Sequence, residues 1–240
     1  MMQDILTVMW RERRGLLRVQ GSRSRFFVIL LSPVLMAVVA PWEEGKDWFS
    51  SPLPVILSAV IAFLLVGTLI PDAFAGERER NTLETLLATR LPDRAILLGK
   101  FLASVVFGLG VTAVFLALSL VVANISAWEG GLRFFVPTIG WGSLALSLVV
   151  ATLVGGLGIL ISLRSSTVQE ATQLLMAVLL APIIALQAVG LLMADQLRDF
   201  LRQLDGQQVL LFTVGALATV DLAVFLLALA RFHRARLIAG

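Results

Sequence analysis

Six long apolar runs constrain the fold of this chain more than any other feature of its sequence. They fall at about residues 26–42, 53–75, 95–123, 134–163, 171–194 and 209–230. A helix of roughly 20 apolar residues is long enough to cross the hydrocarbon layer of a bilayer. Backbone groups in that layer must bond within their own segment, which a helix allows. The sequence therefore predicts an all-α integral membrane protein with six transmembrane helices, forming a single transmembrane domain over residues 1–240.

The composition agrees with a membrane protein and excludes several kinds of site. Apolar residues make up 58% of the chain and charged residues 15%, against about 25% charged residues in soluble domains. The absence of cysteine excludes disulfides, thiolate metal ligands and cysteine nucleophiles. A single histidine, His233, argues against a histidine-based metal site. We therefore expect no metal and no cofactor on this chain.

The distribution of basic residues predicts the orientation in the membrane. Fifteen Lys and Arg residues fall in the N-terminal segment, the loops after the second and fourth spans, and the C-terminal tail, against four in the remaining loops. Basic residues concentrate on the cytoplasmic side of membrane proteins. We expect a multi-pass protein of the cell inner (plasma) membrane with both termini in the cytoplasm. The net charge of +3 then reflects this bias and not a nucleic-acid partner.

Two segments outside the spans have a helical pattern. In residues 2–19, apolar side chains fall on one side of a helix and Asp4 and the arginines on the other. This pattern predicts that residues 1–25 form a cytoplasmic amphipathic helix lying on membrane lipid; a disordered basic tail is the alternative. Residues 195–208 also carry apolar residues at helical spacing, which predicts a short helix on the outer surface.

Motifs for catalysis are lacking. A P-loop requires Ser or Thr after Gly-Lys, and here Phe101 follows Gly99-Lys100. Neither HExxH nor GxSxG occurs. The glycines in Gly155-Gly156-Leu157-Gly158 lie in an apolar run, where they favour close helix packing or bending over phosphate binding. We expect no catalytic residue on this chain.

Two carboxylates fall inside apolar runs, where an ionisable group is a functional hypothesis by default. Asp72 follows Pro71 near the end of its run, which indicates a wet boundary. Asp221 lies near the middle of the last run. It could pair neighbouring helices or line a transport path. An intramembrane hydrolase would need a second carboxylate facing it, and none is evident.

The predicted cytoplasmic loop 76–94 carries a short helix. Asn81 and Glu84 have the spacing of a capping box. Leu83, Leu86 and Leu87 form an apolar stripe. A helix over residues 81–88 is too short to be stable alone. We therefore expect it to pack on the membrane, on the bundle or on another protein.

The stretch 75–102, AGERERNTLETLLATRLPDRAILLGKFL, resembles the corresponding loop in the membrane subunits of type-2 ABC export permeases. The matching residues are Glu77, Glu79, Thr82, Leu83, Glu84, Leu86, Leu87, Gly99 and Lys100. The family usually has glycine where this chain has Asn81, and its proline comes earlier than Pro92. The basic N-terminal helix, six spans and an outer helix before the last span also resemble that family.

The resemblance implies a division of labour. A separate ABC ATPase subunit would bind ATP and Mg. This chain would not itself be an enzyme; it would form the path as a homodimer with a second permease subunit. Residues 81–88 would be the coupling helix. The implied ATPase-docking residues are Glu77, Glu79, Asn81, Thr82, Leu83, Glu84, Leu86 and Leu87, with a second, smaller contact at Arg164 and Glu170.

Other functions remain open at this point. One is the related haem-handling permease subunit of cytochrome c maturation. The others are a membrane scaffold and an intramembrane enzyme built around Asp221. The sequence does not identify the transported substrate.

Overall fold

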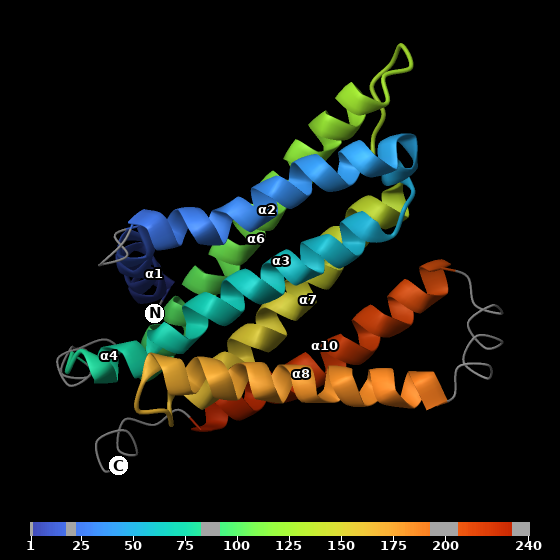
Figure 1. Cartoon of the computed structure of the whole chain (residues 1–240). Helices are drawn as coiled ribbons and strands as arrows, with labels where there is room; N and C mark the ends of the chain where they lie inside the picture. Colours follow the sequence, from blue (N-terminus) through green and yellow to red (C-terminus); the bar gives the residue numbers. More distant parts are fainter. Residues whose placement is uncertain (1, 18–22, 83–91, 193–205, 232–240) are drawn as a thin grey trace.

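The computed structural model describes residues 2–17, 23–82, 92–192 and 206–231. Within these ranges the regular structure is helical (Figure 1), as the sequence predicts. The α-helices are α1 (Met2–Leu17), α2 (Arg23–Glu44), α3 (Leu53–Leu69), α4 (Ala75–Glu79), α6 (Asp93–Ser126), α7 (Pro137–Ser162), α8 (Val168–Leu192) and α10 (Gly206–Arg231). Two 3₁₀ helices, η1 (Gly45–Phe49) and η2 (Ile70–Ala73), flank α3.

Among the described residues, five helices are long and apolar enough to cross a membrane. They are Leu53–Glu79, Arg94–Ser126, Pro137–Ser162, Val168–Ala185 and Gly206–Ala228. The first predicted span, 26–42, lies within helix α2, but α2 is not among the five. The span at 26–42, the total of six spans and the interfacial position of α1 therefore stay predictions. The predicted outer helix at 195–208 lies mostly outside the described residues.

Two of the observed helices begin or end at a different residue from the predicted spans, and a proline explains each difference. The fourth span begins at Pro137 and not at residue 134, since proline suits the first turn of a helix. The second predicted span, 53–75, is interrupted at Pro71, which cannot donate a backbone hydrogen bond. The chain passes through η2 there and resumes as α4, so helical structure continues to Glu79, inside the predicted loop.

The helices pack around α3, which lies between α6 and α7 (Figure 1). Helices α1 and α2 pack on the far side of α6, and α10 packs on α7. Helix α8 contacts α7, η2 and α4. Helices α3, α6 and α7 therefore form the centre of the bundle, with α1 and α2 packed on one side and α8 and α10 on the other.

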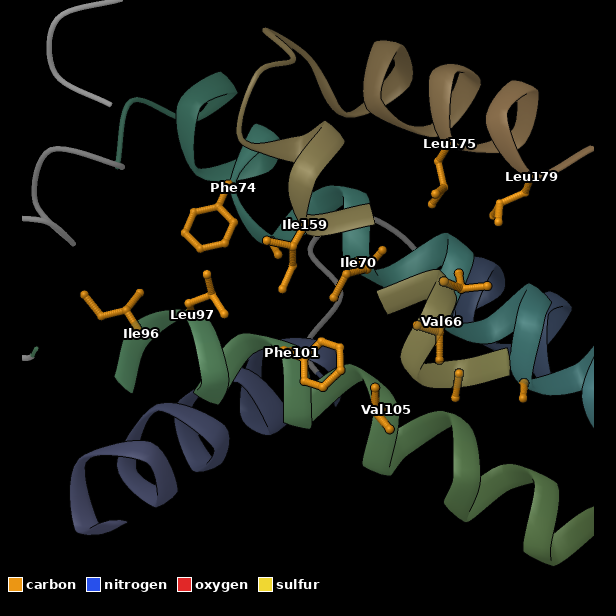
Figure 2. Packing of buried hydrophobic residues seen from close by; sticks show 14 residues of the cluster. Val66, Ile70, Phe74, Ile96, Leu97, Phe101, Val105, Ile159, Leu175 and Leu179 are labelled. Carbon is orange, nitrogen blue, oxygen red and sulfur yellow. The ribbon is translucent and has the colours of Figure 1, made fainter. Parts of the chain in front are cut away.

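A buried apolar cluster surrounds the break between α3 and α4. Phe74 and Ile70 contribute from this break, Phe101 from α6, Ile159 from α7 and Leu175 from α8. Figure 2 shows these side chains converging from four elements. The cluster holds the irregular backbone of η2 against the bundle, where its groups can find partners inside the protein.

Three glycines let α7 approach different neighbours closely. A Cβ at Gly155 would clash with the ring of Phe101, and one at Gly158 would overlap Ile70. At Gly156 it would press on Val224 of α10. The packing role predicted for this Gly-rich stretch is confirmed.

Exposed tryptophans mark the end of the bundle opposite α4. Trp42, Trp128 and Trp141 are 61%, 61% and 74% exposed. Tryptophan is enriched at membrane–water interfaces. From Trp141 to Ser162, helix α7 spans about 31 Å at 1.5 Å per residue, close to the ~30 Å hydrocarbon thickness. The bundle is therefore as long as a bilayer is thick.

Candidate functional site

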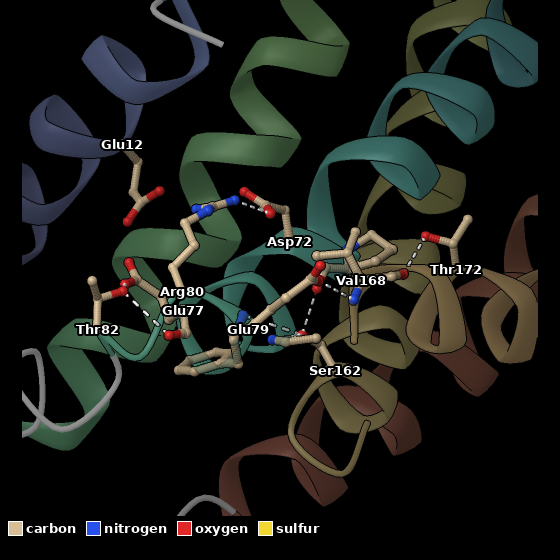
Figure 3. Close-up of polar contacts among 12 residues, drawn as sticks. Glu12, Asp72, Glu77, Glu79, Arg80, Thr82, Ser162, Val168 and Thr172 are labelled. Carbon is tan, nitrogen blue, oxygen red and sulfur yellow. Dashed lines mark hydrogen bonds and ion pairs between the residues drawn. The ribbon is translucent and has the colours of Figure 1, made fainter. Parts of the chain in front are cut away.

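Polar residues gather where α1, α4, the first turns of α6 and the turn 163–167 between α7 and α8 meet. Figure 1 shows these elements at one end of the bundle, which we call the polar end. The predicted docking segments 77–82 and 164–170 both lie there. Figure 3 shows the side chains that connect them.

Ser162 joins the last turn of α7 to the start of α4. Its Oγ accepts hydrogen bonds from the backbone N–H of Phe74 at 3.1 Å and of Ala75 at 2.9 Å. The same hydroxyl donates to the carbonyl of Pro71 at 2.8 Å. All three bonds are buried, so one serine from α7 satisfies backbone groups at the break before α4. It acts as an N-terminal cap supplied by another helix.

Arg78 and Glu79 bind the turn between α7 and α8. The Arg78 guanidinium donates to the carbonyl of Leu163 at 3.0 Å and to that of Ser165. The Glu79 carboxylate accepts from the backbone N–H of Val168 at 3.0 Å. The positive charge of Arg78 thus lies at the C-terminal end of α7, and the negative charge of Glu79 lies at the N-terminal end of α8. Each charge has the sign that the dipole of its helix end favours.

Glu170 stabilises the start of α8. Its carboxylate accepts from the backbone N–H and the hydroxyl of Ser166, both at 2.8 Å. In return, the Thr167 hydroxyl accepts from the backbone N–H of Glu170 at 3.2 Å. This exchange resembles a capping box. Glu170 therefore has a structural role in addition to the predicted docking role.

Lys100 is a buried cation that links three elements. Its side chain is 2% exposed and lies 2.7 Å from the Glu12 carboxylate of α1 and 3.3 Å from the Glu77 carboxylate of α4. Its ammonium also lies 5.7 Å from the centre of the Phe74 ring. A buried charge is tolerated only when it is paired and hydrogen-bonded. Two carboxylates and an aromatic face meet this requirement.

Asn81 ends helix α4. Its φ is +55°, a left-handed conformation. The N–H of Asn81 donates to the carbonyl of Arg78, and the N–H of Thr82 donates to that of Glu77. This pair of bonds defines a Schellman motif, which glycine or asparagine normally completes. The predicted N-cap role of Asn81 concerns a helix over residues 81–88, most of which lies outside the described residues, so it stays a prediction.

Asp72 lies at a wet boundary, as predicted. It forms an ion pair with Arg80, and the two side chains are 46% and 53% exposed. Figure 3 shows this pair beside Glu77 and Thr82. An exposed pair of this kind contributes little to stability.

The described part of the first predicted docking segment, residues 77–82, forms one continuous surface with the second, residues 164–170. Glu79 and Arg78 hold them together, and their outward residues are exposed. We call this surface the exposed polar face; its residues are Glu79, Arg80, Asn81, Thr82, Arg164, Ser166, Thr167, Gln169 and Glu170. Glu77 is turned inward and is only 15% exposed. The predicted docking residues Leu83, Glu84, Leu86 and Leu87 lie outside the described residues.

Comparison with known proteins assigns the chain to a family. The sequence profile described as "ABC-2 type transporter" matches residues 3–186, most of the chain. The chain belongs to the ABC-2 type transporter family. It is also similar to the ABC transporter permease protein NatB of Bacillus subtilis (strain 168), with 31% identity over 163 residues. That match covers 61% of this chain and 42% of NatB, so the chain spans less than half of this relative.

Membership of the ABC-2 type transporter family agrees with the resemblance seen in the loop sequence. The chain is a multi-pass membrane protein of a family of transport subunits. The Schellman motif also explains one departure from the family pattern. Where the family usually has glycine, Asn81 adopts the left-handed conformation that glycine provides most easily.

Three residues of the polar end were not recognised as site residues from the sequence of this ABC-2 family member. Glu12 stands alone among arginines, and Ser162 ends an apolar run. Lys100 matched the family's loop motif, but in the sequence it was counted only as one of the basic residues that set the orientation. A lysine within the first turns of an apolar span was the available signal, because such a residue needs a partner.

Asp221 lies apart from the polar end, between α7 and α10. One oxygen of its carboxylate accepts from the Thr152 hydroxyl at 2.6 Å. The other, Oδ1, is buried without a hydrogen-bond partner among the described residues. This contact favours a helix-pairing role for Asp221 over a role in an intramembrane hydrolase, because the group that faces Asp221 is a threonine and not a second carboxylate.

Proposed function

We propose that this chain is the permease subunit of an ATP-driven exporter, working as a homodimer with separate ABC ATPase subunits that hold ATP and Mg. The observation that carries the proposal is the exposed polar face, in which residues 79–82 of the first predicted docking segment lie beside the second, residues 164–170. Family membership supports the transport role. In the proposed assembly, both termini and the polar end lie in the cytoplasm, where an ATPase can reach them.

The polar end has the connections that a coupling element needs. Ser162, Arg78 and Glu79 fix α4 to the ends of α7 and α8. Lys100 fixes α4 to α1 and α6 through its two carboxylate partners. A displacement of α4 by a bound ATPase would therefore move several spans as well as α3. Rigid-body shifts of packed helices are a common form of such transitions.

The charges on the exposed polar face divide into two groups. Glu77 is occupied by Lys100, so we assign it to bracing the site from within. Arg164 and Gln169 are exposed and have no hydrogen bond or ion pair among those the structure describes. We propose that these two residues contact the ATPase directly. The segment 83–88 supplies the apolar part of the contact through Leu83, Leu86 and Leu87, with Glu84 as a charge.

Co-purification with the candidate ATPase tests the proposal. Arg164→Glu reverses a charge on the exposed polar face, and Leu87→Asp places a charge in the predicted apolar stripe. Lys46→Glu is the matched control, because Lys46 is an exposed cation in η1 at the opposite end of the bundle. We expect both face variants to lose ATPase binding and the control to retain it.

Two outcomes would contradict the proposed docking. One is that wild type binds no ATPase when the two are expressed together. The other is that Arg164→Glu and Leu87→Asp keep full binding and full ATP-driven transport. The thermal midpoint of each purified variant serves to show that the bundle is folded.

For Asp221 we propose a helix-pairing role that stabilises α10 on α7. Asp221→Asn keeps a hydrogen-bond acceptor for Thr152, whereas Asp221→Ala removes it. We expect Ala to lower stability more than Asn, with transport per folded molecule unchanged in both. A loss of transport in a fully stable Asn variant would instead place Asp221 on the path.

A further inference from the structure

We propose that the groove between α1, α2 and α6 binds an anionic phospholipid, with the acyl chains in the groove and the headgroup at the basic end of α1. The groove has a volume of about 800 Å³. Its fifteen lining residues are all apolar or aromatic. This site is distinct from the polar end and from the proposed docking of an ATPase.

The shape of the groove fits hydrocarbon chains. It follows α6 from Ala103 to Leu118, which is about 22 Å at 1.5 Å per residue. That length exceeds half of the ~30 Å hydrocarbon layer, so the groove reaches from one interface past the midplane. Val106 and Val114 are 54% and 62% exposed along it. The groove is therefore open to the side, where a lipid can enter.

The volume of the groove is large enough for two acyl chains. A cavity of about 150 Å³ accommodates benzene, so about 800 Å³ accommodates on the order of thirty carbon atoms by the same measure. That is the amount of hydrocarbon in two acyl chains.

The charge of the neighbouring sequence selects an anionic headgroup. Leu6, Met9 and Trp10 line the groove from α1. In the sequence, Trp10 is followed within one turn by Arg11, Arg13 and Arg14. The acidic residue in that turn, Glu12, is engaged by Lys100. Trp10, which is 56% exposed, has a ring suited to the headgroup level.

Two glycines provide a matched pair of variants. Gly110 lines the groove, and a Cβ added there would meet no atom within 4 Å. Gly215 in α10 is equally open and lies outside the groove. Gly110→Leu therefore fills the groove without a clash at Cβ, while Gly215→Leu makes the same change elsewhere. Val114→Phe, at an exposed lining residue, fills the groove independently.

The test measures lipid retained by the purified full chain. Each variant is incubated with phosphatidylglycerol or with phosphatidylcholine of the same acyl chains, and retained lipids are counted by native mass spectrometry. We expect wild type and Gly215→Leu to retain phosphatidylglycerol about fivefold over phosphatidylcholine, the ratio corresponding to about one basic residue near an anionic surface. Gly110→Leu and Val114→Phe should lose this retention.

Several results would overturn the inference. If both groove-filling variants retain phosphatidylglycerol as wild type does, the groove is not the site. Equal retention of the two lipids in wild type would refute the anionic headgroup. If the groove-filling variants dissociate a dimer and leave lipid retention unchanged, the groove is an interface between copies. None of these readouts depends on an ATPase.

Discussion

At the scale of single residues, Lys100 determines how the polar end is held together. It is the buried cation on which α1 and α4 both converge. Without it, the carboxylates of Glu12 and Glu77 would lose the cation that they share. Breaking a buried ion pair from one side costs more than removing the whole pair, because the remaining charges stay desolvated.

We therefore predict that Lys100→Met lowers the free energy of unfolding by about 3 kcal/mol, the low end of the range for a broken buried pair. The low end applies because Glu12 is still 27% exposed. Unfolding in mixed detergent micelles would measure the change. Adding Glu12→Gln and Glu77→Gln to this variant should recover most of the loss. If the triple variant is no more stable than Lys100→Met, the carboxylates are not the cause.

Ser162 offers a second test at this scale. Ser162→Ala removes the acceptor of two buried N–H groups, and we predict a loss of about 1–3 kcal/mol, the usual cost of unsatisfied buried groups. Ser147→Ala is the matched control on the same helix. The Ser147 hydroxyl is also buried but bonds only the carbonyl of Leu144 in its own helix. Equal thermal midpoints for the two variants would contradict a special role for Ser162.

At the scale of elements, the close approach of α7 to its neighbours depends on its glycines. Gly158 faces Ile70 in η2, where a Cβ would overlap a side chain. The approach places Ser162, one turn further along α7, within reach of Pro71, Phe74 and Ala75. The geometry of the polar end thus depends on a small residue one turn away.

We predict that Gly158→Ala destabilises the protein by about 1–3 kcal/mol, as overpacking of a core does. Gly215→Ala should be neutral or stabilising by up to about 1 kcal/mol, because alanine favours a helix and the site is open. Thermal unfolding of the two purified variants measures both effects. If Gly158→Ala is as stable as Gly215→Ala, helix α7 does not need that close contact.

At the scale of the whole molecule, the direction of the bundle in the membrane follows from its two unlike ends. The polar end carries the buried Lys100 with its two carboxylates and the exposed polar face, while the other end carries the exposed Trp42, Trp128 and Trp141 and one exposed ion pair, Glu129–Arg133. The chain has no cysteine, so single cysteines can be introduced without background. A bundle of this length places the two ends on opposite sides of a bilayer.

We predict that Ser166→Cys and Thr82→Cys react with a membrane-impermeant thiol reagent only after the cytoplasmic side is exposed. Gly131→Cys, in the link between α6 and α7, should react in intact cells. All three positions are exposed, so burial does not limit the reaction. The reverse pattern would invert the proposed orientation, and labelling of all three from one side would contradict the arrangement of the spans.

The sequence by itself determined the class of fold, the approximate spans and the family. Runs of apolar residues long enough to cross a bilayer have few alternatives to helices, so their positions can be read directly. The loop motif at 77–100 identified the family because its spacing is local. The docking role of residues 77–87 and 164–170 rests on the same local motif and stays a prediction; the sequence treated these segments as two separate contacts.

Only the tertiary structure decided how those segments meet. The bonds from Ser162 to the start of α4, and from Glu79 to Val168, join residues more than eighty positions apart. The pairing of Lys100 with Glu12 spans a similar separation. A local pattern cannot specify such contacts, because they depend on how closely α6 and α7 pack. That packing places residues 77–82 beside residues 164–170 on one face.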